Sequence, residues 1–146
     1  MKLSMNFSLN ELTSSQTATR QGIKNTPSPA VVENLRMLAA LLEQIRTLLG
    51  SHSIHISSGY RSLALNRYIG SNDTSAHVRG YAADFTCPAF GKPIEVAKKI
   101  AESNLKFDQL IYEGTWVHIS CDPQNRRQLL TARFKDGHTY YTTGIA

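Results

Sequence analysis

The clearest pattern in the chain is a stripe of apolar residues at alternating steps of four and three positions. Its members are Val31, Leu35, Leu38, Leu42, Ile45 and Leu49. This spacing places the side chains on one face of a helix. Ser28 suits the capping position before Pro29, and Gly50 suits the end of the element. We therefore predict a helix from about residue 29 to residue 49. Such a stripe can bind a partner protein, but packing against the core is its commoner role.

Shorter stretches alternate between apolar and polar residues, which is the pattern of strands with one buried face. We predict such strands at residues 54–57, 82–86, 107–112 and 116–121. Near the end of the chain, the dipeptide Asp136-Gly137 separates two more alternating stretches. This dipeptide is typical of a tight turn, so it predicts a hairpin between two further strands, which include residues 132–134 and 139–141.

Two further helices are predicted between these strands. One runs through residues 65–69 and ends at Gly70, and the next begins at Pro93. The inward residues of the second helix are expected to be Ile94, Ala97, Ile100 and Ala101. Residues 1–28 are mostly polar with scattered apolar positions. We expect them to form an arm packed on the domain, with a short helix near residues 14–21.

The order of these elements predicts an α+β fold, because helices come first and antiparallel strands dominate later. The chain has 146 residues, of which 41% are hydrophobic, and this suits one globular domain. Neither internal repeats nor a linker divides it. We therefore expect a single domain over residues 1–146, with a small antiparallel sheet flanked by helices.

Charge narrows the possible partners. The net charge of +5 favours anionic partners such as nucleic acid, acidic lipid or a cell-wall polymer. The longest basic runs are only the pairs Lys98-Lys99 and Arg126-Arg127, so we expect no nucleic-acid partner. No stretch approaches the ~20 apolar residues of a membrane span. The first six residues lack the apolar run of a secretory signal, so we expect a protein made in the cytoplasm without a signal peptide. We also expect the protein to be a monomer.

One pattern of polar residues points to a metal. His77 and Asp84 lie seven positions apart with Gly80 between them, and His118 follows in a strand-like stretch. Imidazole and carboxylate are both good zinc ligands, and three protein ligands leave a fourth position for water. Gly80 allows the loop to turn back so that His77 faces the same point as Asp84. A polar pair on the surface remains an alternative explanation for a histidine and an aspartate at this spacing.

Together these residues resemble the zinc D-Ala-D-Ala carboxypeptidase family, whose fold is shared with hedgehog signalling domains. The matching pieces are S-G-Y-R-S at 58–62, S-x-H-x-x-G-x-A-x-D at 75–84, and W-V-H at 116–118. The opening, at residues 7–12 and 25–29, also looks like the branch of that family common in phage and prophage proteins. The resemblance covers about residues 6–122.

The resemblance implies a zinc peptidase with one Zn²⁺ per chain, bound by His77, Asp84 and His118. The expected substrates are peptidoglycan stem peptides, cut by a D-Ala-D-Ala carboxypeptidase or by an endopeptidase of a phage lysis or tail system. Bound zinc lowers the pKa of its water to about 7 and polarises the scissile carbonyl. Such an enzyme would reach the cell wall after release, in phage lysis or within a virion, or through export by another route.

Three residues are expected to contact the substrate. The guanidinium of Arg61 can bind a carboxylate through two parallel hydrogen bonds, although it can also form a surface ion pair. Ser75 can bond a substrate carboxylate or orient His77, or it can be an ordinary turn residue. Trp116 shares a strand face with His118 under two-residue alternation, so it either lines the pocket or packs in the core.

The general base is where the sequence departs from the family. Many relatives carry a glutamate three residues before the last histidine ligand, and here that position is Thr115. The nearest carboxylate is Glu113, five residues before His118, and we predict that it is the base. Glu113 can also be a solvated turn carboxylate. The departure at Thr115 leaves a second class of function open, a non-catalytic zinc-binding interaction module of the same fold.

The two cysteines are Cys87 and Cys121, each three residues after a proposed metal ligand. Two cysteines are too few for a disulfide scaffold. In a protein made in the cytosol, we expect them to be buried free thiols.

Overall fold

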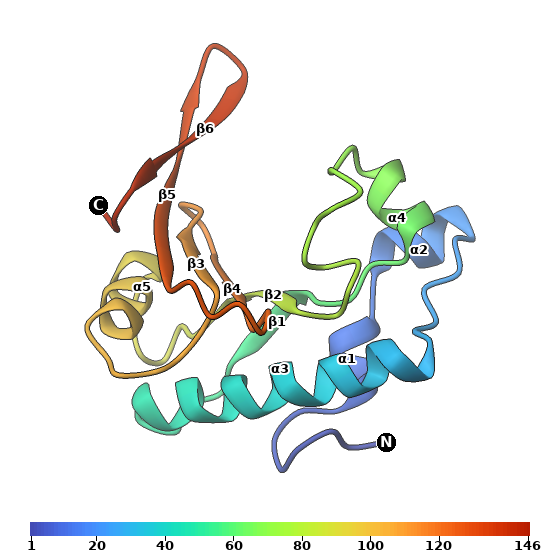
Figure 1. Ribbon diagram of the computed structural model, residues 1–146, viewed down its shortest axis with the longest axis horizontal. Helices are drawn as coiled ribbons and strands as arrows, with labels where there is room; N and C mark the ends of the chain where they lie inside the picture. The colour runs from blue at the N-terminus through green and yellow to red at the C-terminus, as the bar shows by residue number, and fades with distance from the viewer.

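The computed structural model describes all 146 residues of the chain. A six-stranded sheet forms its centre, in the order β1-β2-β4-β3-β5-β6 (Figure 1). The strands are β1 (His55–Ser58), β2 (Ala82–Thr86), β3 (Gln109–Tyr112), β4 (Val117–Ser120), β5 (Gln128–Lys135) and β6 (His138–Thr143). The helices are α1 (Leu9–Thr13), α2 (Gln16–Gln21), α3 (Pro29–Leu48), α4 (Leu63–Tyr68) and α5 (Pro93–Ala101). The predicted α+β fold is confirmed.

The sheet differs from the prediction in one pairing. All neighbouring strands are antiparallel except β3 and β5, which run parallel. The chain crosses over the start of β3 between β4 and β5, and the backbone N–H groups of Arg127 and Gln128 donate to the carbonyls of Phe107 and Asp108. The carboxylate of Asp108 also accepts two hydrogen bonds from the guanidinium of Arg126, of 2.9 and 2.8 Å. This crossing brings β5 beside β3 in the same direction.

Local sequence explains the principal helix. The Ser28 hydroxyl accepts from the backbone N–H of Val31, and Pro29 occupies the first turn, as the capping pattern predicted. The stripe packs on the core rather than lying open for a partner, since Leu35, Leu38, Leu42, Ile45 and Leu49 are fully buried. In α5, Ala97 and Ile100 are buried as expected, whereas Ile94 and Ala101 are half-buried.

Residues 1–28 contain one helix more than the sequence analysis anticipated. The predicted short helix is α2, and α1 precedes it, begun by a capping box between Ser8 and Glu11. Phe7 and Leu12 from this segment are buried in the main hydrophobic cluster. The carbonyl of Leu12 accepts a 2.7 Å hydrogen bond from the backbone N–H of Tyr60. The N-terminal residues therefore contact the loop that follows β1.

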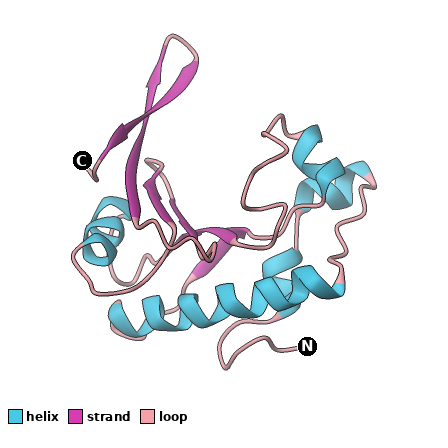
Figure 2. Cartoon of the chain, in the orientation of Figure 1, coloured by secondary structure: helices cyan, strands magenta, loops and turns pink.

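The two faces of the sheet have different environments because successive side chains in a strand point to opposite sides. One face packs against α3 and α5 and forms the hydrophobic core (Figures 1 and 2). Its strand residues include Ala83, Phe85, Leu110, Val117 and Ile119. The other face carries the alternate residues, Asp84, Ile111 and His118 among them, and is not covered by these helices. The two free cysteines, Cys87 and Cys121, are buried, as predicted.

The β5–β6 hairpin reaches away from the body of the molecule (Figure 1). Its turn is the predicted Asp136-Gly137 pair, with φ of 51° and 77°. Positive φ at both positions is what a two-residue hairpin turn with the twist of the strands requires. No helix in the structure combines the length and the apolar character needed to cross a membrane.

Candidate metal centre

The uncovered face of the sheet lines an open cleft with a volume of about 700 Å³. The lining comes from the loop between α4 and β2, and from strands or strand ends across the sheet. The predicted residues His77, Asp84 and His118 all lie in this cleft, together with Arg61, Ser75, Glu113 and Trp116. The structure therefore brings the proposed metal ligands, the proposed base and the proposed substrate-binding residues to one cleft.

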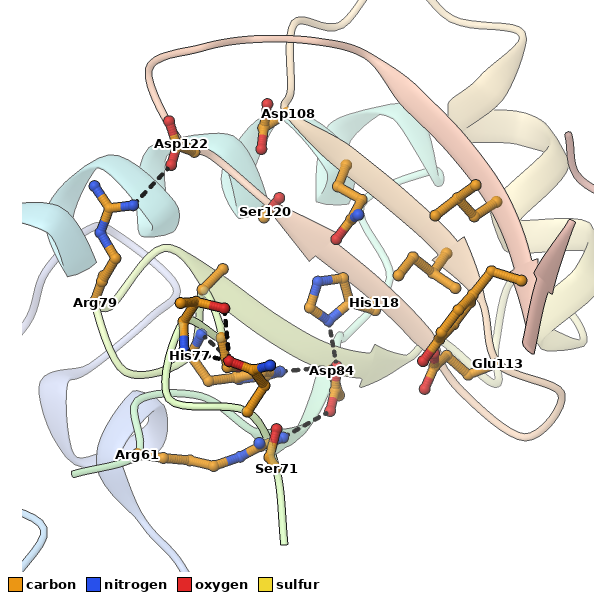
Figure 3. A pocket seen from close by; sticks show the side chains of 18 of the residues that line it. Arg61, Ser71, His77, Arg79, Asp84, Asp108, Glu113, His118, Ser120 and Asp122 are labelled. Atoms are coloured by element: carbon orange, nitrogen blue, oxygen red, sulfur yellow. Dashed lines mark hydrogen bonds and ion pairs between the residues drawn. The ribbon is translucent and has the colours of Figure 1, made fainter. Parts of the chain in front are cut away.

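Strand pairing sets two of the three proposed metal ligands side by side. Asp84 on β2 and His118 on β4 are direct partners in the antiparallel ladder. The Nδ1 atom of His118 lies 2.9 Å from Oδ1 of Asp84 (Figure 3). Direct cross-strand neighbours share a face of the sheet, so rigid backbone holds this pair without help from a loop.

The third ligand comes from the long loop between α4 and β2 (Figure 2). The Nδ1 atom of His77 lies 2.7 Å from the carbonyl oxygen of Gly59 and donates to it, which leaves Nε2 at 3.3 Å from Oδ1 of Asp84. Gly80 has a φ of 77°, and a Cβ there would lie 2.9 Å from Cγ1 of Val31. Glycine is therefore required for the turn that returns the loop to Asp84.

The donor set fits zinc. Its ligand atoms lie within 4.8 Å of one another. Ligands about 2.0–2.1 Å from a tetrahedral zinc are roughly 3.3–3.4 Å apart. The 3.3 Å between His77 and Asp84 equals this spacing, and the 2.9 Å between His118 and Asp84 is shorter. The bond from His77 to a backbone carbonyl is the kind of outer contact that fixes the tautomer of a zinc ligand.

The protonation states also suit a metal. Burial lowers the pKa of His77 and outweighs the attraction of Asp84, which favours the neutral form of the imidazole. Burial alone would raise the pKa of Asp84, but the two histidines, through charge and hydrogen bonds, hold it well below its usual value. A neutral imidazole beside an ionised carboxylate is the state in which these groups coordinate zinc.

Arg61 lies beside the proposed metal ligand Asp84. Its Nη2 is 3.7 Å from Oδ2 of Asp84, the oxygen not facing the histidines (Figure 3). Its Nη1 donates to Oδ1 of Asn66 at 3.0 Å, and its Nε donates to the hydroxyl of Ser58 at 3.3 Å. Burial lowers the pKa of this guanidinium, against the pull of Asp84 and Glu113. Arg61 is thus held by the protein in a fixed orientation at the cleft, rather than in a surface ion pair.

Ser75 and Trp116 both line the cleft. The hydroxyl of Ser75 accepts from the backbone N–H of His77 at 3.3 Å, a contact that orients the loop. Trp116 is half-buried, and its indole Nε1 is buried without a hydrogen-bond partner in the protein. The tryptophan is therefore part of the cleft wall rather than of the main core.

Glu113 also lines the cleft, whereas Thr115 is an exposed residue of the β3–β4 turn that does not. Figure 3 shows Glu113 beyond Asp84, on the side away from His77 and Arg79. Burial raises the pKa of Glu113, and the negative charge of Asp84 adds to this against the opposing charges of His118 and Arg61. A half-buried carboxyl group with a raised pKa suits proton transfer near neutral pH.

The cleft contains residues that the sequence analysis did not single out. At one end, Arg79 pairs with Asp122 at 3.2 Å (Figure 3). Ser120, two residues after His118, is buried with an unpartnered hydroxyl, and two-residue alternation along the strand could have identified it. At the other end lies Tyr141 of β6, whose pKa is raised by burial and by the charges of Glu113 and Asp84. The position of Tyr141 follows from the pairing of β6 with β5, and no local sequence pattern indicates it.

Comparison with known proteins agrees with this geometry. A search of curated proteins finds no match to the chain. The model of the family described as Peptidase M15 matches residues 5–120, which include all three proposed metal ligands. This confirms the resemblance to the zinc D-Ala-D-Ala carboxypeptidases and supports a metallopeptidase. Because the match covers most of its length, the chain belongs to the peptidase M15 family.

Proposed function

We propose that the protein is a zinc-dependent peptidase that hydrolyses peptidoglycan stem peptides, as a D-Ala-D-Ala carboxypeptidase or an endopeptidase. The observation that carries the proposal is one cleft holding His77, Asp84 and His118 beside a carboxyl group of raised pKa, Glu113. Membership of the peptidase M15 family supports the same class of reaction. A substrate in the cell wall requires release or export of the enzyme, as in phage lysis or in a virion.

The proposed metal ligands are Nε2 of His77, Oδ1 of Asp84 and Nδ1 of His118. When bound, zinc supplies an acidified water and polarises the scissile carbonyl. Glu113 takes a proton from the attacking water on its carboxylate oxygen and passes it to the nitrogen of the leaving amine. A raised pKa helps this carboxyl group in both directions of transfer.

The remaining cleft residues position the substrate in this proposal. Arg61 faces the cleft with a guanidinium already oriented by Asn66 and Ser58, so little conformational entropy is lost when it meets a carboxylate or a developing oxyanion. Ser75 holds the backbone at His77 and offers its hydroxyl to a terminal carboxylate. Trp116 offers a wall and an unpartnered N–H donor.

A non-catalytic zinc-binding module is the second candidate, and Thr115 at the usual position of the base favours it. The two candidates differ in what they require of Glu113. A module that only binds zinc has no use for a carboxyl group of raised pKa in the cleft.

Purified cell walls followed by turbidity and by release of free D-Ala separate the two candidates. An endopeptidase should clear the suspension, whereas a carboxypeptidase should release D-Ala without clearing it. A chelator should stop either activity, and added zinc should restore it. Mass spectrometry of the released fragments then identifies the bond: loss of a terminal D-Ala marks a carboxypeptidase, and separated cross-links or stem fragments mark an endopeptidase. Zinc binding without any cleavage product would favour the non-catalytic module. Full activity after complete removal of metal would contradict both.

A further inference from the structure

The β5–β6 hairpin adds a wall to the cleft that the family match does not cover. The match ends at residue 120, and the two strands occupy residues 128–143. Two side chains of this hairpin, Leu130 and Tyr141, nevertheless line the cleft that contains the three proposed metal ligands. This chain therefore extends the shared site with an element outside the matched region.

Strand register shows which face of the hairpin continues the cleft. Ile111 of β3, a cleft residue, is the partner of Leu130 on β5. Along β5 the same face carries Ala132 and Phe134, because side chains alternate. Direct antiparallel partners share a face, so Tyr141 and Thr139 of β6, opposite Ala132 and Phe134, belong to it as well.

This face, which we call the hairpin face, consists of Leu130, Ala132, Phe134, Thr139, Tyr141 and Thr143. Its two aromatic rings are open to solvent, with 67% of Phe134 and 52% of Tyr141 exposed. Phe134 is the diagonal neighbour of Tyr141 across the hairpin, within the reach of aromatic side chains. Exposed rings that continue a cleft are typical of a ligand-binding surface.

The charges differ sharply between the hairpin face and its surroundings. No residue of the hairpin face is ionisable at neutral pH, and its polar groups are hydroxyls. The opposite side of the same hairpin carries Arg133 and Lys135 with Tyr140. The metal end of the cleft is also charged, with Arg61, Asp84 and Glu113. A ligand for the hairpin face is therefore uncharged, with apolar surfaces for the rings and polar groups for the hydroxyls.

We infer that the hairpin face binds the glycan of the substrate, as N-acetylhexosamine rings stacked on Tyr141 and Phe134. This inference rests on the proposed function, since the glycan is the neutral part of a peptidoglycan whose stem peptides carry carboxylates and amines. Sugar rings have apolar C–H faces for the aromatic side chains and hydroxyls for Thr139 and Thr143. The charged metal end then receives the peptide, while the hairpin holds the sugar strand to which the peptide is attached.

A binding experiment tests the inference without requiring cleavage. The probe is a β-1,4-linked N-acetylglucosamine tetramer, titrated into the full chain by calorimetry. The double variant Phe134→Ala, Tyr141→Ala should bind about tenfold more weakly, because both rings that contact the sugars are removed. Tyr140→Ala removes a ring of similar exposure, 48%, from the opposite side of the hairpin and should bind as the unmodified chain does. Tyr141→Phe should also retain binding, because it keeps the ring.

Kinetics supply a second measurement. The ratio of kcat/KM for a glycan-linked stem peptide to that for the free peptide should fall about tenfold in the double variant and stay unchanged in Tyr140→Ala. Equal losses on both substrates would assign the rings to the peptide and overturn the inference. Absence of tetramer binding by the unmodified chain, or equal weakening by Tyr140→Ala, would also overturn it. Tetramer binding that depends on the rings, in a chain that cuts no peptide, would instead refute the proposed peptidase while leaving the glycan surface standing.

Discussion

The same strands of this protein build two very different surfaces. On the helix side, Phe85, Val117 and Ile119 are completely buried among apolar neighbours. On the cleft side, the alternate positions His118 and Ser120 are polar, and they are also largely or fully buried. Three atoms on this side, Nε1 of Trp116, Nε2 of His118 and Oγ of Ser120, find no hydrogen-bond partner within the protein.

An unpartnered buried polar group costs about 1–3 kcal/mol of stability. The apolar side chains of the core face carry no such group, whereas the cleft face has unpartnered groups at Trp116, just before β4, and at His118 and Ser120 within β4. The comparison teaches that the hydrophobic core and the candidate metal site occupy opposite sides of the same strands. Substitutions on the core side should therefore lower the free energy of unfolding, whereas substitutions on the cleft side should lower zinc binding or activity.

The largest effect is expected at the metal ligands. His77→Ala combined with His118→Ala removes two of three donors, so bound zinc should fall from about one per chain to nearly none. Metal analysis of the purified variant measures this, and circular dichroism checks that the fold persists. His55→Ala, at an exposed histidine of β1, is the matched control and should keep its zinc. Unchanged zinc content in the double variant would exclude this site.

On the core side, Phe85→Ala should destabilise the protein by about 3–5 kcal/mol, the usual cost of removing a buried phenylalanine side chain. Chemical denaturation followed by circular dichroism measures the change. The fraction that remains folded should still bind zinc, although Phe85 adjoins the ligand Asp84 in sequence, because the two side chains point to opposite faces. A decrease in the free energy of unfolding below about 1 kcal/mol would show that Phe85 does not stabilise the core as proposed.

Glu113→Gln should lower kcat by about 10² while zinc stays bound, since it removes the proposed base and preserves size. Glu113 acts as a base only when ionised, so activity should be lost as pH falls through its pKa. Burial raises that pKa in the free enzyme, which places the acidic limb of the kcat/KM profile above the ordinary value of about 4.3.

The limb assigned to Glu113 should be absent from the pH profile of the glutamine variant. Thr115→Ala, in the same turn but outside the cleft, is the control and should retain both the rate and the limb. If the glutamine variant keeps a normal rate, another group accepts the proton.

Arg61→Lys keeps the charge but removes the forked guanidinium, and kcat/KM should fall about tenfold or more. The measurement pairs steady-state kinetics with metal analysis, because Arg61 touches both the cleft and Asp84. Retained zinc and a similar melting temperature are expected for a residue that recognises substrate. Loss of zinc would mean that Arg61 acts by holding Asp84 in place.

The smallest effect is expected at Ser120. Its hydroxyl is buried without a partner, so Ser120→Ala should leave the free energy of unfolding within about 1 kcal/mol and shift it towards greater stability. Denaturant titration measures this shift. A clear loss of stability would show that the Ser120 hydroxyl forms a hydrogen bond, so the cleft face would have one unpartnered group fewer.

Local patterns accounted for much of the fold and for the positions of the site residues. The helical stripe from Val31 to Leu49 and the Asp136-Gly137 turn depend on residues close in sequence, and both were found. His77, Asp84 and His118 were located by ligand chemistry and motif register, and the structure places their donor atoms together. The pKa of Glu113 could not be predicted, because it depends on burial and on charges brought near by folding.

Long-range pairing was the part beyond sequence reasoning. The parallel contact of β3 with β5 depends on a crossing held by Asp108 and Arg126, and no local periodicity encodes it. The place of Tyr141 in the cleft follows from that contact, since β6 reaches the site only through β5. Helix α1 was missed for a different reason, because its capping box at Ser8 and Glu11 was visible but the helix has only five residues.

The hydrogen bond between Leu12 and Tyr60 has a thermodynamic consequence for the metal. Gly59, next to Tyr60, accepts from Nδ1 of His77, and the backbone N–H of Arg61 donates to the carbonyl of His77. A side chain at Gly59 would collide with the carbonyl of Leu12, so the first helix and the ligand loop contact the same three residues. The two coupled events are docking of the N-terminal segment and binding of zinc, and such coupling is reciprocal. If docking of the N-terminal segment around α1 strengthens zinc binding by a given free energy, bound zinc stabilises the docked segment by the same free energy.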